Sequence, residues 1–496
     1  MKPKLIAWKI ILKDSFLLSL SRFISQGIGI FTGVLLRRWL GPYNIGIWTA
    51  FKIMLGYGEY TNLGSLAAMD REYPRLSGAG DIDKATHYLN TSFGIITSTS
   101  LIVGILFSSW ALYFKNELSA LVSIGLVALA FINFFLQNYN FFIIYFRCEH
   151  RFKHLALFYV LSIIFELLMI LLFVPGLGIL GVYIGILCAY IFNYFFLRIT
   201  SKLTLKLTLD PETTVKIIGY GVKLIAIGIL TSLFRDMDKI MIGMVLGSES
   251  LGLYSIPMMA FGLVMSAAET IETVQRPSVQ EAFGEASSAS YIQTFIIIPI
   301  EGLCFFMPLF LVGIYAFLPP FVHTVLPAFV LGLEPLPWLL MAYFFYTTTI
   351  FTSSFIITLQ KNRLLIILLI LFVIISAIVN RLVIMRGGEI LAVSVVTLVL
   401  FFIYASVLML YVCKKIKNSM FFRSLITESC MLIYIILCVF ILNIFIKKRE
   451  SWTGAFIYFI LFLGLYMPVI NIYEKKRGFF KRFFQLIKDY FSSSIR

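Results

Sequence analysis

The chain has 496 residues, of which 60% are hydrophobic and 13% charged, and its formal net charge is +16. Ordinary soluble globular proteins carry about 25% charged residues, so this composition excludes that class, and it is far too apolar for a disordered chain. A positive charge of this size would indicate nucleic acid as a partner of a soluble protein. In a membrane protein, Lys and Arg instead collect in the cytoplasmic segments. We therefore expect a membrane protein with no nucleic-acid partner.

Apolar stretches long enough to cross a bilayer recur along the whole chain. A helical span needs about 20 apolar residues, and on this measure there are about 14 spans. They are centred near residues 25, 54, 101, 131, 165, 187, 225, 258, 305, 347, 374, 400, 435 and 462. An even number places both termini on one side, and the excess of Lys and Arg on that side predicts that it is cytoplasmic. The predicted fold class is an all-α polytopic membrane protein.

In chain order, the spans fall into blocks. A basic, amphipathic cytoplasmic N-terminus over residues 1–14 precedes an N-terminal lobe of six helices over 15–198. A cytoplasmic linker, 199–214, leads to a second lobe of six helices over 215–412 and two further helices over 413–473. The tail, 474–496, alternates basic clusters with Phe, Leu and Ile, a pattern typical of a helix lying on an anionic membrane surface.

The two six-helix blocks share a turn sequence, which indicates an internal duplication. The matching positions are offset by 206 residues along the chain: Leu40-Gly41, Gly46 and Trp48 in the first block, Leu246-Gly247, Gly252 and Tyr254 in the second. Glycine supplies backbone conformations that other residues resist, and the aromatic residue is expected to anchor at the membrane interface. The lobes are therefore predicted to be parallel pseudo-repeats.

Three cations, Arg22, Lys52 and Lys223, lie inside predicted spans. A charge at the bilayer centre costs roughly 3 kcal/mol on insertion scales, so such residues are rare and mark functional sites. We expect them to face a wet cavity and to bind an anion.

Polar side chains share helical faces with these cations. Gln26 follows Arg22 at a spacing of four, and Tyr220 precedes Lys223 by three. Another span carries Asn133, Gln137, Asn140 and, further along, Arg147. Residues at these spacings lie on one face of a helix. The Asn and Gln side chains can line the cavity or hydrogen-bond between helices, and the sequence leaves both readings open.

Carboxylates within apolar sequence are candidates for ion coupling, because a buried carboxyl can exchange a proton or hold a cation. The candidates are Glu59, Glu166, Glu269 and Glu301. The alternative is a structural salt bridge, since Glu59 lies seven residues after Lys52 on the same helical face.

Three apparent motifs do not support catalysis. Gly176-Leu-Gly178-Ile-Leu-Gly181 matches a dinucleotide fingerprint but lies between two spans, where we expect a tight turn. Asp236 and Asp238 resemble the acidic pair of a membrane glycosyltransferase, although pairing with the neighbouring Arg235 and Lys239 is the simpler account. The Cys and His residues show no metal-ligand spacing. We expect a transporter without cofactor or metal rather than an enzyme.

Residues 14–76, with SRFISQGIGIFTGVLLRRWLGPYNIGIW at their core, resemble the opening of bacterial polysaccharide-biosynthesis flippases. These form the O-antigen type of the multidrug/oligosaccharidyl-lipid/polysaccharide (MOP) exporter superfamily. Residues 219–283, with RDMDKIMIGMVLGSESLGLY, resemble the entry to the second half of that family. The resemblance implies two six-helix lobes around a central cavity, as in MATE and MOP proteins, with two extra helices.

The resemblance also implies a function. The substrate is expected to be an oligosaccharide on undecaprenyl pyrophosphate, moved to the outer leaflet of the bacterial inner membrane. The cavity cations Arg22, Lys52 and Lys223 would then engage the pyrophosphate, with Arg71 and Arg147 nearer the cytoplasmic mouth. Inward Na⁺ or H⁺ on a cavity glutamate could reset the carrier. We expect a monomer in contact with membrane lipids and a polysaccharide polymerase or ligase as partner; the alternatives are a multidrug antiporter of the same superfamily and a membrane glycosyltransferase or polymerase.

Overall fold

The computed structural model describes residues 2–117, 119–285, 289–359, 361–416, 434, 437–444 and 450–477. These residues form helices and turns with no strands, as the sequence predicts. The chain divides into two compact units, Met1–Asp236 and Met237–Arg496. The predicted lobe limits, 15–198 and 215–412, remain a prediction, and most of the basic tail lies outside the described residues.

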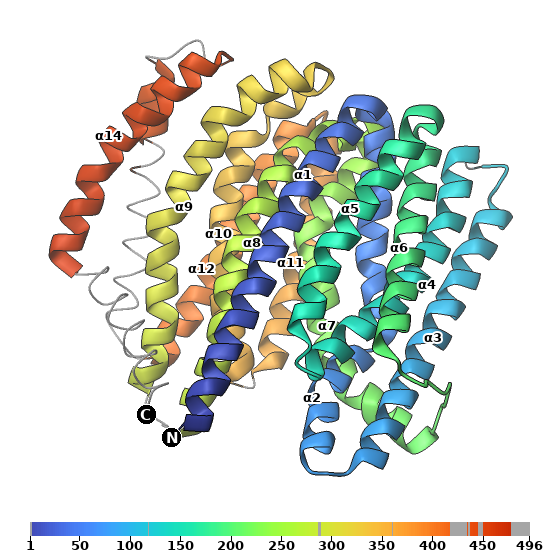
Figure 1. Ribbon diagram of the computed structural model, residues 1–496. Helices are drawn as coiled ribbons and strands as arrows, with labels where there is room; N and C mark the ends of the chain where they lie inside the picture. The colour runs from blue at the N-terminus through green and yellow to red at the C-terminus, as the bar shows by residue number, and fades with distance from the viewer. Residues whose placement is uncertain are drawn as a thin grey trace. The chain divides into compact units, whose positions relative to one another are not determined.

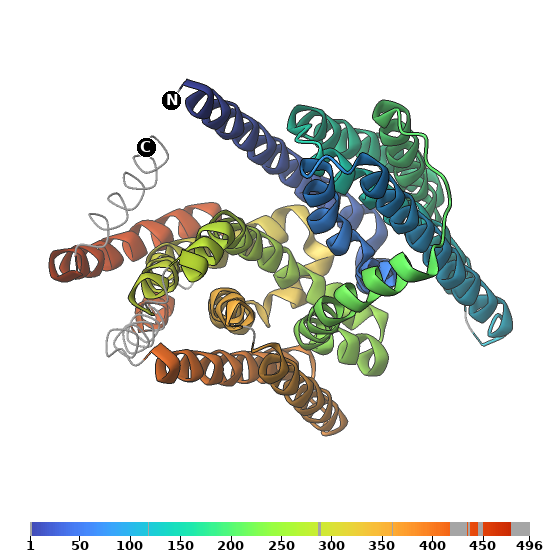
Figure 2. The same ribbon diagram turned by 90° about the horizontal axis from the view of Figure 1, so that it is seen from below.

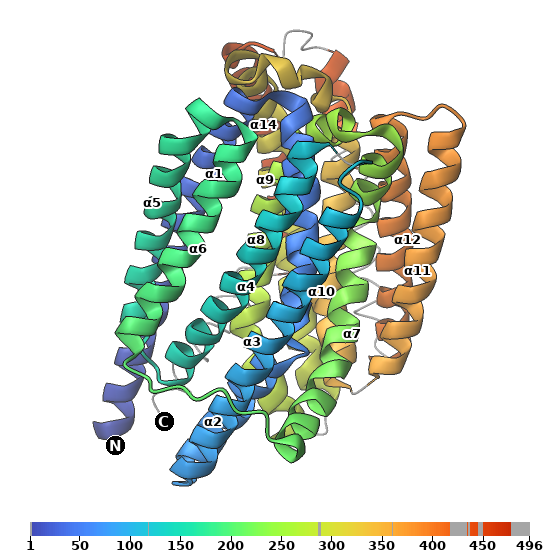
Figure 3. The same ribbon diagram turned by 90° about the vertical axis from the view of Figure 1, so that its right-hand side faces the viewer.

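The first unit begins with helix α1 (Lys2–Gly58), short helix η1 (Glu59–Asn62) and α2 (Ser65–Gly78). The helices α3 (Ile82–Tyr113), α4 (Ala120–Cys148), α5 (Phe152–Leu177), α6 (Ile179–Ser201) and most of α7 (Pro211–Met241) follow (Figure 1). Helix α3 packs on α4, α5 packs on both α1 and α6, and α4 also contacts α6 (Figure 3). Buried Phe93, Phe141, Phe146 and Phe158 belong to the core between these helices.

Helix α1 contains the first two predicted spans, because its path breaks at Gly41. Gly41 has φ 70° and ψ 175°, a conformation that residues with a Cβ atom rarely adopt, and Pro42 follows it. The chain therefore turns there, and the two segments run alongside each other in Figure 3. Gly178, with φ 56°, likewise makes the tight turn predicted between α5 and α6.

The second unit contains η2 (Ile242–Leu246), a π-helical turn, then α8 (Ser248–Glu285), α9 (Ala289–Val325) and η3 (Pro327–Leu333). Helices α10 (Leu336–Thr358), α11 (Asn362–Met385), α12 (Ile390–Ile416) and α14 (Trp452–Arg477) complete it. Helix α10 packs against α12, α8 and α9, while α14 lies against α9. Figure 2 shows the helices of each unit in a view turned by 90°.

Ten helices among the described residues are long and apolar enough to cross a membrane. The chain is a multi-pass membrane protein, whereas the full number of about 14 remains a prediction. The ten are Ile82–Tyr113, Ala120–Cys148, Phe152–Leu177, Ile179–Ser201, Pro211–Leu246, Phe305–Val325, Leu336–Thr358, Asn362–Met385, Ile390–Lys414 and Trp452–Asn471.

The two turn glycines of the proposed duplication have nearly the same backbone conformation. Gly247 has φ 89° and ψ 178°, close to the values at Gly41. This agreement supports the predicted repeat. The expectation for the following aromatic residues is wrong, however: Trp48 is 6% exposed and Tyr254 is fully buried, so both pack inside the protein rather than anchoring at its surface. Each turn brings its helix back against neighbours, and the aromatic residue fills that contact.

Candidate functional site

One wall of a pocket in the first unit is formed by the second segment of α1. Trp48, Lys52 and Gly56 follow one another at intervals of four residues, so all three lie on one face of the helix. Leu55 lies beside them, and Glu59, the first residue of η1, extends the same wall. The helical face that Lys52 and Glu59 were predicted to share therefore lines a cavity.

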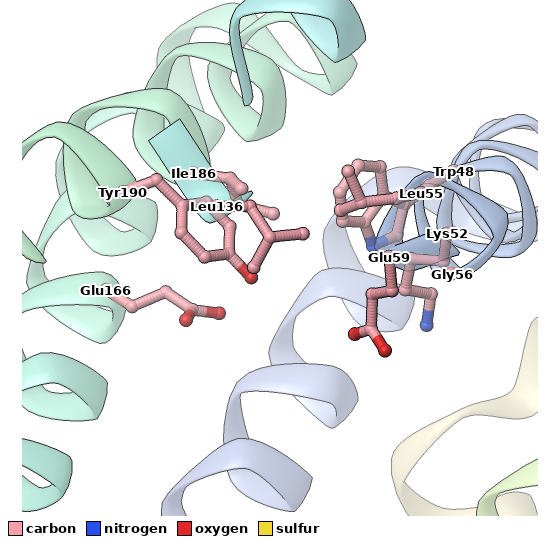
Figure 4. A pocket seen from close by; sticks show the side chains of 9 residues that line it. All are labelled: Trp48, Lys52, Leu55, Gly56, Glu59, Leu136, Glu166, Ile186 and Tyr190. Carbon is pink, nitrogen blue, oxygen red and sulfur yellow. The ribbon is translucent and has the colours of Figure 1, made fainter. Parts of the chain in front are cut away.

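Three other helices of the first unit form the rest of the pocket. Leu136 comes from α4, Glu166 from α5, and Ile186 and Tyr190 from α6. Figure 4 shows the side chains of Glu166 and Tyr190 across the cavity from those of Lys52 and Glu59. The cavity volume is about 280 Å³. That lies near the lower end of the range for ligand pockets, about 300–1,000 Å³, so the pocket can hold a small charged group but not a whole oligosaccharide.

Among the described residues, the pocket lining has one ammonium group, on Lys52, and two carboxyl groups, on Glu59 and Glu166. Lys52 and Glu59 have exposed side chains, while Glu166 and Tyr190 are partly buried. Among the described side chains, none of these charged groups forms an ion pair within 4 Å. Lys52 nevertheless acts electrostatically on Glu166, and Glu59 on Arg235 of α7. Charges held apart in this way remain open to a bound ligand.

The predicted amide stripe of α4 serves mainly as a contact between helices. Gln137 donates from its side-chain nitrogen to the carbonyl oxygen of Gly58, and Asn62 donates to the Gln137 side-chain oxygen at 3.4 Å. The buried Asn133 amide lies so close to Gly58 that a Cβ atom there would stand 2.4 Å from its oxygen. Gln137 thus holds the end of α1 against α4 by hydrogen bonds, and both Gln137 and Asn133 lie outside the residues that line the pocket. Neither side-chain polar atom of the buried Asn133 has a hydrogen-bond partner among the described residues, so only Gln137 forms the interhelical hydrogen bond.

Arg22 lies on the first segment of α1, away from the pocket lining. Its side chain is exposed, and the guanidinium carbon lies 5.8 Å from the centre of the Tyr159 ring of α5. This is cation–π distance, so the aromatic face stabilises the charge. Gln26 and Asn140 also lie outside the pocket lining.

The two arginines predicted for the cytoplasmic mouth have different surroundings. Arg147 forms an ion pair with Asp70 at 2.6 Å, which occupies its guanidinium. Arg71 is 61% exposed and stands over the ring of Tyr220, 5.0 Å from its centre. A hydrogen bond with Tyr220 raises the pKa of Arg71 above its ordinary value, so this guanidinium stays charged. Arg71 is therefore the more accessible of the pair.

Three predicted site residues cannot be placed. The side chains of Lys223, Glu269 and Glu301 lie outside the described part of the structure, although their helices, α7, α8 and α9, are described. Their expected roles in anion binding and ion coupling remain predictions.

The structure adds three residues that the sequence reasoning missed. Trp48 and Tyr190 line the pocket, and Arg37 is buried in α1, where it donates to the carbonyl oxygen of Gly33 at 2.9 Å and acts electrostatically on Lys52. Its neighbour Arg38 is exposed. Adjacent arginines point to different faces of a helix, and only the packing decides which one is buried.

The acidic pair considered for catalysis is engaged in structural contacts. Asp236 forms an ion pair with Arg235 at 3.2 Å in the first unit. In the second unit, Asp238 is 3% exposed, pairs with Lys239 at 3.1 Å and accepts a hydrogen bond of 2.7 Å from the Tyr254 hydroxyl. Among the described residues, no cluster of His, Cys, Asp and Glu could hold a metal ion. The geometry favours charge pairing over a glycosyltransferase site.

Solved structures with the same fold are transporters of the MOP superfamily. Lipid II flippase MurJ in an inward closed conformation has a TM-score of 0.69 at 15% identity, covering 93% of this chain and 99% of that chain. An inward-facing multidrug resistance MATE transporter of the MOP superfamily has a TM-score of 0.66 at 14% identity, covering 79% of this chain and 94% of that chain. A MOP superfamily transporter from Pyrococcus furiosus, described as having a binding pocket of reverse polarity, has a TM-score of 0.58 at 15% identity. The match covers 82% of this chain and 96% of that chain. The fold is thus that of the MOP superfamily.

The sequence comparison is more specific than the fold. The profile of a family described as "Polysaccharide biosynthesis protein" matches residues 80–327, half of the chain. The chain belongs to this polysaccharide biosynthesis family of the MOP superfamily, as the resemblance of its two turn regions predicted. A comparison with curated proteins found no match.

Proposed function

We propose that the protein is a flippase. It moves an oligosaccharide linked to undecaprenyl pyrophosphate from the cytoplasmic to the outer leaflet of the bacterial inner membrane. The observation that carries this proposal is the exposed side chain of Lys52 in the pocket between α1, α4, α5 and α6, without an ion pair to another described side chain. Family membership and the fold shared with a lipid II flippase support it.

The chemistry follows from what each part of the substrate needs. Stripping water from one sugar hydroxyl without replacing its hydrogen bonds costs roughly 2–7 kcal/mol, so a polar path is required for the glycan. The polyprenyl tail can remain in lipid. The diphosphate is anionic and binds Lys52, and its outward movement is favoured by about 2.3 kcal/mol per charge per 100 mV when the cell interior is negative. Alternating access, coupled to an ion on a pocket glutamate, completes the proposed cycle.

The decisive experiment removes the ammonium while keeping a polar, unbranched side chain. Lys52→Gln should weaken diphosphate binding roughly 10- to 100-fold, because a hydrogen bond to a charged group contributes about 1.5–3 kcal/mol. Transfer of a fluorescent lipid-linked oligosaccharide in proteoliposomes measures this loss. Lys153→Gln, at an exposed lysine of α5, is the matched control and should transport normally. Equal transport by Lys52→Gln and wild type, at equal protein levels, contradicts the proposal.

A second candidate function is multidrug antiport. The specific observation in its favour is the presence of Glu59 and Glu166 together with the rings of Trp48 and Tyr190, a combination that can bind an organic cation. On this alternative, deletion of the gene causes drug sensitivity with normal surface polysaccharide. Loss of surface polysaccharide with unchanged drug sensitivity supports the flippase.

A further inference from the structure

The segment between α6 and α7 crosses α3 as a strap, residues 203–210, that contains no helix or turn (Figure 3). The backbone N–H of Lys206 donates to the side-chain oxygen of Asn90 at 3.1 Å. Four residues further along α3, Gly94 has no room for a Cβ atom, because the carbonyl oxygen of Thr208 lies directly against it. The strap is therefore fixed to α3 between Asn90 and Gly94.

This crossing lies where α3 changes from polar to apolar sequence. Residues 81–90 include four Asp, Lys or His residues, whereas residues 93–110 include no Asp, Glu, Lys, Arg or His. An apolar helical run of this length lies in the hydrocarbon of a bilayer, and charged residues lie outside it. The contacts at Asn90 and Gly94 therefore place the strap at the boundary between lipid and water.

The leucines of the strap divide between the protein and its surroundings. Leu203 and Leu205 pack against the core of the first unit, whereas Leu207 is 66% exposed and Leu209 is 56% exposed. The backbone N–H groups of Leu205, Leu207 and Leu209 form no hydrogen bond within the described part of the chain. Hydrocarbon does not tolerate bare N–H groups, whereas burying exposed leucine surface in lipid is favourable. The membrane interface offers both water and acyl chains, so it meets both conditions.

The lysines at the strap carry charge that no described side chain neutralises. Lys202 and Lys206 are exposed, and neither forms an ion pair with a described residue. Of the two carboxylates that follow, Asp210 accepts a hydrogen bond of 2.8 Å from the Thr213 backbone, and Glu212 lies in an ion pair within α7. Two unpaired ammonium groups next to two exposed leucines fit a phospholipid with an anionic head group above its acyl chains.

We propose that the strap is a binding site for anionic phospholipid in the leaflet on the predicted cytoplasmic side. Leu207 and Leu209 contact the acyl chains, and Lys202 and Lys206 bind the head-group phosphate. None of these residues lines the pocket at Lys52, so the site does not depend on which substrate the protein carries. Lipid and its bound water then cover a backbone edge that would otherwise be open to pairing with another chain.

The first test measures depth in the membrane. The fluorescent amino acid acridonylalanine is introduced at position 207 of the full-length protein in proteoliposomes. Its quenching by lipid with a doxyl group near the head group is compared with its quenching by iodide in the water. Position 207 should be quenched by the doxyl lipid, like position 106 in the apolar run of α3, whereas the exposed position 79 before α3 should respond to iodide alone. Quenching of position 207 by iodide alone overturns the proposal and leaves the strap free to pair with a strand of another protein.

The second test measures the contribution of charge. Native mass spectrometry gives the affinity of the purified protein for its most tightly bound phosphatidylglycerol. Each lysine should account for roughly a fivefold difference, so Lys202→Gln combined with Lys206→Gln should bind this lipid about 25-fold more weakly. The control, Lys84→Gln combined with Lys216→Gln, removes the same charge from lysines that already pair with carboxylates, and it should bind normally. Equal affinities of the two double variants overturn the proposal; if a double variant does not fold, the single variants Lys202→Gln and Lys206→Gln decide in the same way.

Discussion

At the scale of single residues, the spacing along one helix predicts which side chains share a face. It does not predict which side chain of another helix lies opposite that face. The spacing of Lys52 and Glu59 predicts a shared face, and that face does line a pocket. Glu166 was recognised as a carboxyl within an apolar run. Its place opposite Lys52, however, depends on how α5 packs against α1, and no local pattern in the sequence contains that information.

The buried pair of Asp238 and Lys239 allows a sharp prediction about stability. Lys239→Met should destabilise the protein by about 3–5 kcal/mol, because it leaves the carboxylate of Asp238 buried without its counter-charge. Asp238→Asn together with Lys239→Met should recover much of this loss, since no buried charge then remains. Thermal unfolding in detergent, followed by size-exclusion fluorescence, measures the shifts.

The control for this pair is an exposed ion pair of the same chemistry. Lys216 and Glu212 lie 2.6 Å apart on α7, but both side chains are at least 70% exposed. Lys216→Met should change stability by at most about 1 kcal/mol. Equal losses from Lys216→Met and Lys239→Met would show that burial of the Asp238 pair contributes nothing.

At the scale of elements, glycine and proline positions predict where the helices break and turn. They do not predict which helices contact one another. The break at Gly41 and the turn at Gly178 were both predicted from sequence. The tight approach of α7 to the turn between η1 and α2 was not predicted, because Gly64 and Gly221 are far apart in the chain and neither stands in a recognisable motif. A Cβ atom on Gly221 would lie 2.5 Å from the carbonyl oxygen of Leu63.

Because of this contact, two glycines of α7, Gly219 and Gly221, should respond differently to substitution by alanine. Gly221→Ala should destabilise the protein by about 1–3 kcal/mol and lower transport, since the added methyl group forces α7 away from the turn at Leu63 and Gly64, which directly follows η1. Gly219→Ala meets no atom within 4 Å and should be neutral or stabilise by up to about 1 kcal/mol, because alanine is the better helix former. Melting temperatures of the two purified variants test this, and a Gly221→Ala variant as stable as Gly219→Ala would contradict the close packing.

At the scale of the whole molecule, composition and hydropathy suffice for the class of protein, and its topology in the membrane remains to be measured. The helical, multi-pass character was predictable because a bilayer requires every backbone polar group to be satisfied within a helix. The sequences around the two turns led to the family by resemblance, and the family profile matches residues 80–327. The substrate-binding geometry was less predictable because it combines side chains from α1, α4, α5 and α6.

The excess of Lys and Arg predicts that both termini are cytoplasmic. A green fluorescent protein fused to the C-terminus should therefore fluoresce, whereas an alkaline phosphatase fused there should be inactive. The same two reporters after Leu177, in the predicted outer turn, should give the opposite pattern. Active phosphatase at the C-terminus would mean an odd number of spans from a cytoplasmic N-terminus, and the count of about 14 would then be wrong.

The pocket of about 280 Å³ has room for a charged head group and little else. On the proposed function, it therefore contacts the one portion that lipid-linked glycans of every composition possess. Replacing the sugars should then leave affinity at Lys52 nearly unchanged, and any preference among glycans must arise from other surfaces along the transport path. Exchanging such surfaces between relatives should change which polysaccharide is transported and leave the affinity for the diphosphate of the lipid carrier unchanged.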